Sequence, residues 1–234
     1  MWFTKPTFVG VLVLQIAAIV SANTEKVIFL GPQSVQLPQD GPSFATLGLN
    51  RLSPKFANYR SALPVTFPNS SHPRGLQSWY LLHDLSPGAR YEVRICWAAT
   101  QPTNWILEVF NVTETMEIPE LIQGLALYTE QRTASITSDD QGVSNDQFKS
   151  PQSLLFLRVH GAADYFSLDE GLMQRPESVK VDLILDSFLL NILPRSLLPT
   201  AIYVCAIAIF GLFASNLVWI WLVGTHGTHK ERIE

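Results

Sequence analysis

The reactive side chains of this sequence are few, and its best carboxylate cluster has two interpretations. Asp164, Asp169 and Glu170 lie close together in the segment ADYFSLDEGL. Carboxylates of this kind serve as acids and bases in enzymes, including glycosyltransferases. Ser167 and Glu170, however, have the three-residue spacing of a helix capping box. We therefore favour a turn and helix cap over a catalytic pair.

Other residues that could carry chemistry show no pattern typical of an active site. The sequence contains no G-x-S-x-G elbow, no phosphate-binding loop and no H-E-x-x-H pair. Cys96 has no activating partner nearby in the sequence, and the histidines show no ligand spacing in the body of the chain. We expect no catalytic, metal-binding or cofactor-binding residues, and we expect that the protein is not an enzyme. The histidines are His72, His83, His160, His226 and His229.

A long apolar run near the C-terminus predicts one membrane-spanning helix. Residues 201–223 read AIYVCAIAIFGLFASNLVWIWLV, in which only Ser215 and Asn216 are clearly polar. About 20 apolar residues suffice to cross the hydrocarbon core as a helix. A signal for a glycolipid anchor is the alternative, but such a signal ends in its apolar tail. Here residues 224–234 follow the run, so we expect the span to remain in the mature protein.

The N-terminal residues predict the orientation of this span. Residues 1–22 have the layout of a secretory signal peptide, with Lys5, an apolar core and small residues before a cleavage site after Ala22. An uncleaved anchor is the alternative. Cleavage places residues 23–187 in the lumen and residues 224–234 in the cytosol, and Lys230 and Arg232 agree with that direction. We expect a single-pass type I protein, with residues 188–200 as a juxtamembrane segment in the headgroup layer.

The composition narrows the compartment and the partners. The formal net charge is −4 and no basic cluster stands out, so nucleic acid is not an expected partner. Cys96 and Cys205 fall in the lumenal body and in the span, which makes an internal disulfide improbable. Asn69 and Asn111 begin sequons on the lumenal side and are candidate N-glycosylation sites.

The lumenal body has the pattern of short strands separated by turn residues. YEVRICW alternates apolar and other residues with a period of two, as a strand with one buried face requires. The spacing predicts a mainly β lumenal domain, an immunoglobulin-like or fibronectin-III-like β-sandwich, followed by the C-terminal transmembrane helix. The predicted strands are Val27–Leu30, Val35–Leu37, Trp79–Leu82, Tyr91–Trp97, Trp105–Val112, Leu154–Val159 and Val179–Leu185.

The segment LSPGARYEV sharpens this prediction. A leucine and a Pro-Gly turn precede Tyr91, as at the strand entry of fibronectin type III domains, where the tyrosine hydroxyl bonds back across the corner. Three other segments do not fit the strand pattern. We expect a long irregular connection at Leu47–Ser71 and a polar loop at Ser135–Ser153. Ile118–Thr133 is either a short helix beginning after Pro119 or a strand.

The predicted span has two different faces on a helical wheel. Small residues let another helix approach closely, and an intramembrane asparagine can hydrogen-bond across such a contact. The bulky residues lie largely opposite. The alternative is an isolated span in which the small residues align by chance. The candidate partner-contact residues are Ala201, Cys205, Ala208, Ser215 and Asn216.

Several stretches together resemble the fungal Pga1 family, the accessory subunits of GPI mannosyltransferase II. They are TEKVIFLGP, GLNRLSP, SWYLLHDLSPGARYEVRICWAATQPTNW, LLFLRVHGAADYFSLDEGLM and VKVDLILDSFLLNILPRSLLPT, between a signal peptide and a terminal span. The resemblance implies an endoplasmic-reticulum membrane protein that supports addition of the second mannose to the GPI precursor. It implies a multispanning GPI mannosyltransferase catalytic subunit as partner, besides membrane lipid, and it carries over no catalytic residue.

Two other functions remain open on the sequence alone. The first is a single-pass binding module of the secretory pathway or cell surface, such as an adhesion or cargo receptor. Its location would distinguish it from a subunit resident in the endoplasmic reticulum. The second is a lumenal enzyme that uses the acidic segment around Asp164 and Asp169.

Overall fold

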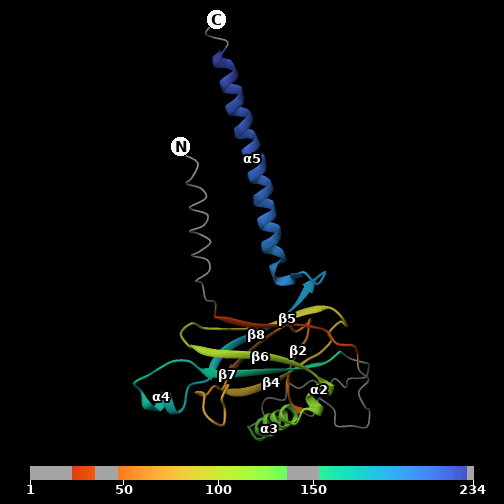
Figure 1. Ribbon diagram of the computed structural model, residues 1–234, viewed down its shortest axis with the longest axis vertical. Coiled ribbons are helices and arrows are strands. Elements are labelled where there is room, and N and C mark those ends of the chain that lie inside the picture. Colours follow the sequence, from red (N-terminus) through yellow and green to blue (C-terminus); the bar gives the residue numbers. More distant parts are fainter. Residues whose placement is uncertain (1–22, 35–46, 136–152, 231–234) are drawn as a thin grey trace. The chain divides into compact units, whose positions relative to one another are not determined.

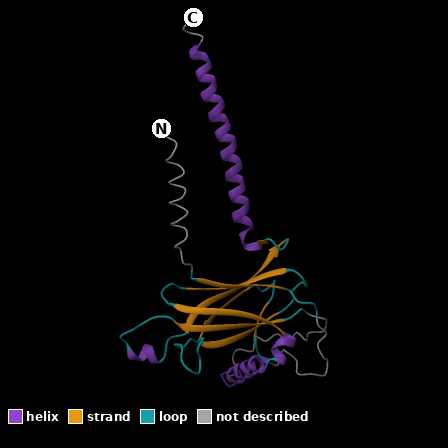
Figure 2. Ribbon diagram, viewed as in Figure 1, coloured by secondary structure: helices purple, strands orange, loops and turns teal. Residues whose placement is uncertain are grey.

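The computed structural model describes residues 23–34, 47–135 and 153–230, and the fold is mainly β (Figures 1 and 2). The chain forms two compact units, Met1–Leu185 and Asp186–Glu234, which are taken separately below. The signal peptide, the strand predicted at Val35–Leu37 and most of the loop predicted at Ser135–Ser153 lie outside the described residues.

The strands of the first unit form two sheets. In the first sheet the order is β1-β5-β8-β3, and the pairs β1–β5 and β3–β8 are antiparallel. In the second the order is β2-β4-β7-β6, in which β2–β4 is parallel and the other pairs are antiparallel. The strands are β1 (Thr24–Leu30), β2 (Asn50–Leu52), β3 (Asn58–Leu63), β4 (Leu76–Leu82), β5 (Arg90–Trp97), β6 (Thr103–Asn111), β7 (Leu155–Ala163) and β8 (Val179–Leu189).

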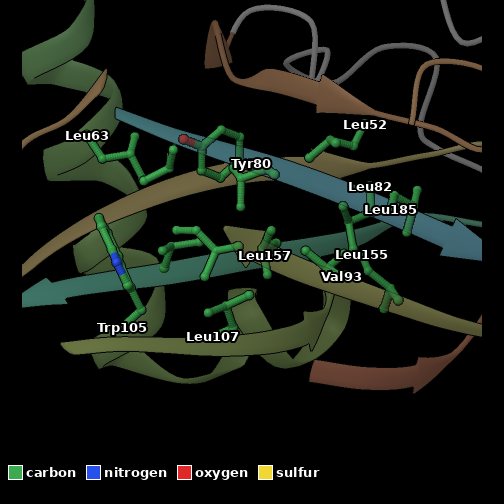
Figure 3. Close-up of a cluster of buried hydrophobic side chains, with 14 of the residues drawn as sticks. Leu52, Leu63, Tyr80, Leu82, Val93, Trp105, Leu107, Leu155, Leu157 and Leu185 are labelled. Atoms are coloured by element: carbon green, nitrogen blue, oxygen red, sulfur yellow. The ribbon is translucent and has the colours of Figure 1, made fainter. Parts of the chain in front are cut away.

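The two sheets pack face to face through one apolar core, which confirms the predicted mainly β sandwich (Figure 3). Alternate residues of each strand enter it, such as Val93 on β5, Leu157 on β7 and Leu183 on β8, all of them fully buried. Burying a side chain of this size stabilises the fold by about 1.5–3 kcal/mol. The parallel β2–β4 pair is a departure from the fully antiparallel sheets of an immunoglobulin domain.

The turn before β5 has the geometry that its sequence predicts. Ala89 N donates to Ser86 O at 3.1 Å, and Gly88 has a φ of 71°, as a Pro-Gly turn of type II requires. The Tyr91 hydroxyl accepts a hydrogen bond from Ser86 N at 2.9 Å. The tyrosine corner is therefore present. A backbone hydrogen bond connects this turn to the residue after β1, because Gly31 N donates to Ala89 O at 2.8 Å.

The prediction of an irregular connection at Leu47–Ser71 is wrong. This segment contains β2 and β3, and Thr66 forms an isolated bridge with Ala162. The polar residues of β3 concealed its pattern, since the strand lies at an edge of its sheet and exposes every second side chain. Tyr59 and Leu63 point toward the core, and Arg60 on the other face pairs with Asp182 at 2.6 Å.

The open alternative at Ile118–Thr133 is settled in favour of a helix. α2 (Val112–Glu117) follows β6 directly, and α3 (Pro119–Ser135) begins at Pro119. Proline fits the first helical position because its missing N–H has no partner there in any helix. Leu121 and Leu125 of α3 pack on the outer face of the second sheet, against Trp79 and Phe156. The helix thus covers a second, smaller apolar cluster.

The second unit begins inside β8 and continues into a long helix. β8 pairs with β9 (Leu193–Pro194) as a short hairpin, and the 3-10 turn η2 (Arg195–Leu197) leads into α5 (Leu198–Lys230). Within Arg195–Val223, an 18-residue window has a mean hydropathy of 2.2 and is not buried within the described protein. α5 is therefore long and apolar enough to cross a membrane, and the helix extends beyond the span predicted at 201–223.

Candidate partner-contact helix and a polar pocket

The five candidate contact residues lie along one side of α5. At 100° per residue, Ala201, Cys205, Ala208, Ser215 and Asn216 fall within about 60° of a common direction. All are exposed except Ala201, which is half-buried. The structure thus leaves this side of the helix accessible, and whether a partner occupies it stays a prediction.

The sequence places two larger residues on the same side of α5. Leu212 and Trp219 complete a series with alternating steps of four and three residues. Steps of this kind place residues along the seam of a left-handed helix pair. Gly211 beside this seam has open space around it, since a Cβ there would meet nothing within 4 Å. The seam residues are Ala201, Cys205, Ala208, Leu212, Ser215 and Trp219.

A buried arginine organises a polar cluster on the outer face of the second sheet. Arg158, in the middle of β7, is only 5% exposed and bonds Glu108 of β6 through Nε at 2.9 Å and Nη2 at 2.7 Å. Its guanidinium carbon lies 5.7 Å from the ring centroid of Trp79 and 5.0 Å from that of Phe110. Glu120 of α3 adds a longer contact at 3.5 Å.

Register explains why these charges meet. Arg158 lies directly opposite Glu108 on β6 and Trp79 on β4, so the three side chains share one face of the sheet. Nε and Nη2 of Arg158 both donate to one carboxylate oxygen, Oε2 of Glu108, and hydrogen bonds between two ionised groups are shorter and stronger than neutral ones. The burial of the Arg158 charge is thus offset by the Glu108 carboxylate and by the two flanking rings.

A pocket of about 350 Å³ lies beside this cluster. Gly75 has a φ of 80°, and a Cβ there would clash with the backbone of Gly161, so only glycine lets these two backbone segments approach so closely. Gly124 of α3 likewise lies against the Gln77 side chain. Most of the lining residues are polar or charged and offer hydrogen-bond donors and acceptors. The lining residues are Ser71, His72, Pro73, Arg74, Gly75, Gln77, Glu120, Arg158 and His160.

His160 is the least satisfied member of the pocket lining. Its two ring nitrogens are buried without a hydrogen-bond partner, although Nε2 lies 3.5 Å from a Glu108 oxygen. Burial lowers the pKa of His160 below its usual range, and the Arg158 charge lowers it further, while Glu108 acts in the opposite direction. The imidazole is therefore neutral at neutral pH and has one donor and one acceptor to offer.

The acidic segment considered for catalysis forms a helix cap instead. Asp169 is the N-cap of α4 (Glu170–Gln174), and its Oδ1 accepts from Gly171 N at 2.8 Å. The predicted capping box of Ser167 and Glu170 is wrong in detail, because Ser167 accepts from Asp169 N and lies outside the helix. Asp164 follows the end of β7 and is exposed. The segment thus has a sufficient structural explanation.

The two sequons lie on exposed positions in different local structures. Asn69 closes a turn, in which its Oδ1 accepts from Ser71 N at 2.9 Å and from His72 N at 2.8 Å. Asn111 is the last residue of β6 and precedes α2. Both side chains belong to exposed residues, and glycosylation of either stays a prediction.

The sequence did not point to the polar cluster, although a signal was present. Glu108 and Arg158 each interrupt a strand that is otherwise rich in apolar residues, WILEVF and LLFLRV. A charge in such a run is rarely buried without a partner. Two interrupted strands of opposite charge therefore suggested a pair, but only the register shows that Glu108 and Arg158 are neighbours.

Comparison with known families supports the predicted resemblance. A family model described as Pga1, GPI-mannosyltransferase II co-activator, matches residues 13–123. Over those residues the match confirms the resemblance to the Pga1 family that the sequence predicts. No curated protein and no solved structure matches the chain. A Pga1 co-activator acts with a GPI mannosyltransferase, so the family description supports an accessory role in GPI-anchor biosynthesis.

The Pga1 match covers the strands from β1 to β6 but leaves out β7 and β8. Each sheet nevertheless needs one of these strands, since β7 lies between β4 and β6 and β8 lies between β5 and β3. The matched segment is therefore part of a larger folded unit. The candidate contact residues of α5 also lie outside it.

Proposed function

We propose that this protein is a non-catalytic accessory subunit of GPI mannosyltransferase II, which stabilises the enzyme and supports addition of the second mannose during GPI-anchor biosynthesis. The observation that carries the proposal is the Pga1 match at residues 13–123, whose description names a co-activator. The partner is a multispanning catalytic subunit in the endoplasmic-reticulum membrane. The sandwich lies in the lumen, and α5 crosses the bilayer once.

The proposal assigns the contact with the catalytic subunit to the small-residue side of α5. Ala201 and Asn216 are about 22 Å apart along the helix axis, which is most of the roughly 30 Å hydrocarbon core. Helices in lipid associate through close packing and interhelical hydrogen bonds. The hydrophobic effect does not drive this association, because lipid tails are as apolar as the side chains. The small residues on this side of α5 allow close packing, and the exposed Asn216 can form an interhelical hydrogen bond.

Analysis of GPI precursors after depletion of the protein tests the function itself. Loss of the second mannosylation step predicts accumulation of an intermediate that carries one mannose. Restoring the wild-type protein should remove that intermediate. A normal precursor profile in depleted cells would refute the accessory role.

Co-purification tests the helix contact. Ala208→Leu combined with Ser215→Leu fills the seam with bulk and should reduce recovery of the mannosyltransferase with the tagged protein. Phe210→Leu combined with Phe213→Leu is the matched control, because it changes exposed apolar residues on the other side of α5. Equal recovery of the transferase with both double variants would remove this side of α5 from the proposal while leaving the accessory role standing.

Two rival functions have their own tests. A binding module predicts protein at the cell surface, whereas the subunit predicts residence in the endoplasmic reticulum. An enzyme predicts that Asp164→Ala with Asp169→Ala abolishes the mannosylation step while the protein still folds and co-purifies. The Asp169 change also removes the cap of α4, so assembly must be measured alongside activity.

A further inference from the structure

The hairpin before α5 has an apolar tip that is exposed among the residues that the structure describes. The tip is Leu189–Ile192, where Ile192 N donates to Leu189 O at 3.0 Å. Leu190 is 83% exposed and Ile192 is 78% exposed. The tip belongs to the same compact unit as α5 and is joined to it through β9 and η2 (Figure 1).

The backbone of the tip makes the presence of leucine there notable. Leu190 has a φ of 52° and Asn191 a φ of 59°, so both central residues of the turn are left-handed. Turns of this kind favour asparagine, aspartate or glycine, and a leucine in that region is strained. Asn191 fits this preference and Leu190 does not. Packing within the described protein does not offset the strain at Leu190, because this residue is 83% exposed.

We infer that the hairpin tip inserts into the interfacial layer of the lipid bilayer, with Leu190 and Ile192 as its anchors. A lipid surface rather than a protein groove is the occupant, since the tip is covalently close to a helix long and apolar enough to span a membrane. Apolar side chains held at the end of a polar segment enter the headgroup and acyl boundary readily. Arg195 follows the hairpin and is exposed, and an arginine at this depth can direct its charged end to the lipid phosphates.

The inference rests on the proposed membrane span, and the experiment separates the two. The full chain carries Cys96→Ser and Cys205→Ala, so that one new cysteine can be labelled with an environment-sensitive fluorophore. The protein is reconstituted alone in phosphatidylcholine vesicles, with nitroxide lipids as the membrane quencher and iodide as the aqueous one. A label at Ile192→Cys reports on the tip, and a label at Leu212→Cys reports on α5.

Insertion predicts that the label at position 192 is quenched by shallow nitroxide lipids and protected from iodide. Leu190→Gly relieves the backbone strain but removes the apolar side chain, and should lower the ratio of lipid-exposed to water-exposed tip roughly tenfold. Asn191→Gly is the matched control. It relieves the left-handed backbone at position 191, next to Leu190, and removes no apolar group, so quenching should be unchanged.

Three results would count against the inference in distinguishable ways. Iodide access at position 192 with lipid quenching at position 212 would overturn tip insertion and keep the span. Iodide access at both positions would overturn the span together with the tip. Protection of position 192 only when the mannosyltransferase is present in the vesicles would assign the tip to the partner protein and overturn the lipid contact.

Discussion

The buried Arg158 charge makes a sharp prediction about stability. Glu108→Ala removes both of the short contacts, at 2.9 and 2.7 Å, from Arg158, which is 5% exposed in the wild-type protein and lies beside two aromatic rings. Breaking a buried pair from one side typically costs 3–5 kcal/mol, and Glu108 is itself 28% exposed on its side chain. We therefore expect a loss of about 3 kcal/mol in the free energy of unfolding.

Glu120→Ala is the matched control for this change. Glu120 also contacts Arg158, but at 3.5 Å and with a side chain that is 82% exposed. An exposed pair of that kind contributes less than about 1 kcal/mol, so the free energy of unfolding should hardly change. Both variants remove a carboxylate from the same arginine. Glu108→Ala also removes the 3.2 Å contact with Arg74, whose side chain is 55% exposed, so that pair contributes less than about 1 kcal/mol.

Urea unfolding of the purified full-length protein in mild detergent, followed by tryptophan fluorescence, measures both variants. With a slope of about 2 kcal/mol/M, the Glu108→Ala midpoint should fall by about 1.5 M. Replacing both partners, as Arg158→Met with Glu108→Leu, should recover most of that loss, because no unpaired charge remains in the apolar surroundings. A midpoint for Glu108→Ala within 0.3 M of wild type, as a rough experimental margin, would refute the reasoning.

Three further predictions concern the corner, the pocket and the glycan. Tyr91→Phe leaves Ser86 N without its 2.9 Å partner and should lower the free energy of unfolding by about 1–2 kcal/mol in the same urea assay. The pKa of His160 is lowered in the folded protein, so protonation favours the unfolded chain. The free energy of unfolding should therefore fall as the pH drops below about 6.5. His160→Gln should reduce this pH dependence of the urea midpoint. Ser71→Ala removes the sequon at Asn69 without removing the Ser71 N–H that holds its turn, and should abolish one glycosidase-sensitive shift on a gel if Asn69 is modified, while an unchanged pattern would mean that it is not.

The architecture was predictable where a single face of a strand is buried. YEVRICW alternates cleanly because β5 has one face in the core, and the turn before it carries residues whose backbone preferences fix the corner. β3 was missed for the opposite reason. It is an edge strand, and its Asn58, Arg60 and Ala62 face away from the core, so its short apolar set is diluted by polar residues.

Pairings between distant segments set the limit of the sequence analysis. Arg158 and Glu108 are 50 residues apart, and their contact depends on the register between β6 and β7. No local pattern contains that register. The same holds for Gly75, which allows a close approach to Gly161 across a distance of more than eighty residues. The small-residue side of α5 was predictable because helical spacing is a local property.

The two units differ in how much of their apolar surface is exposed, and therefore in the solvent that suits each of them. In the first unit the large apolar side chains are mostly buried, and the charge of Arg158 has a partner within the same sheet. From Leu189 onward the described chain exposes most of its large apolar side chains, including both sides of α5. Water is a poor solvent for such a surface, and a bilayer is a good one. A bilayer, however, does not distinguish the small-residue side of α5 from the bulky side, so only a packed partner would make that difference matter. The comparison of Ala208 and Ser215 with Phe210 and Phe213 is therefore the decisive test of the proposed contact along α5.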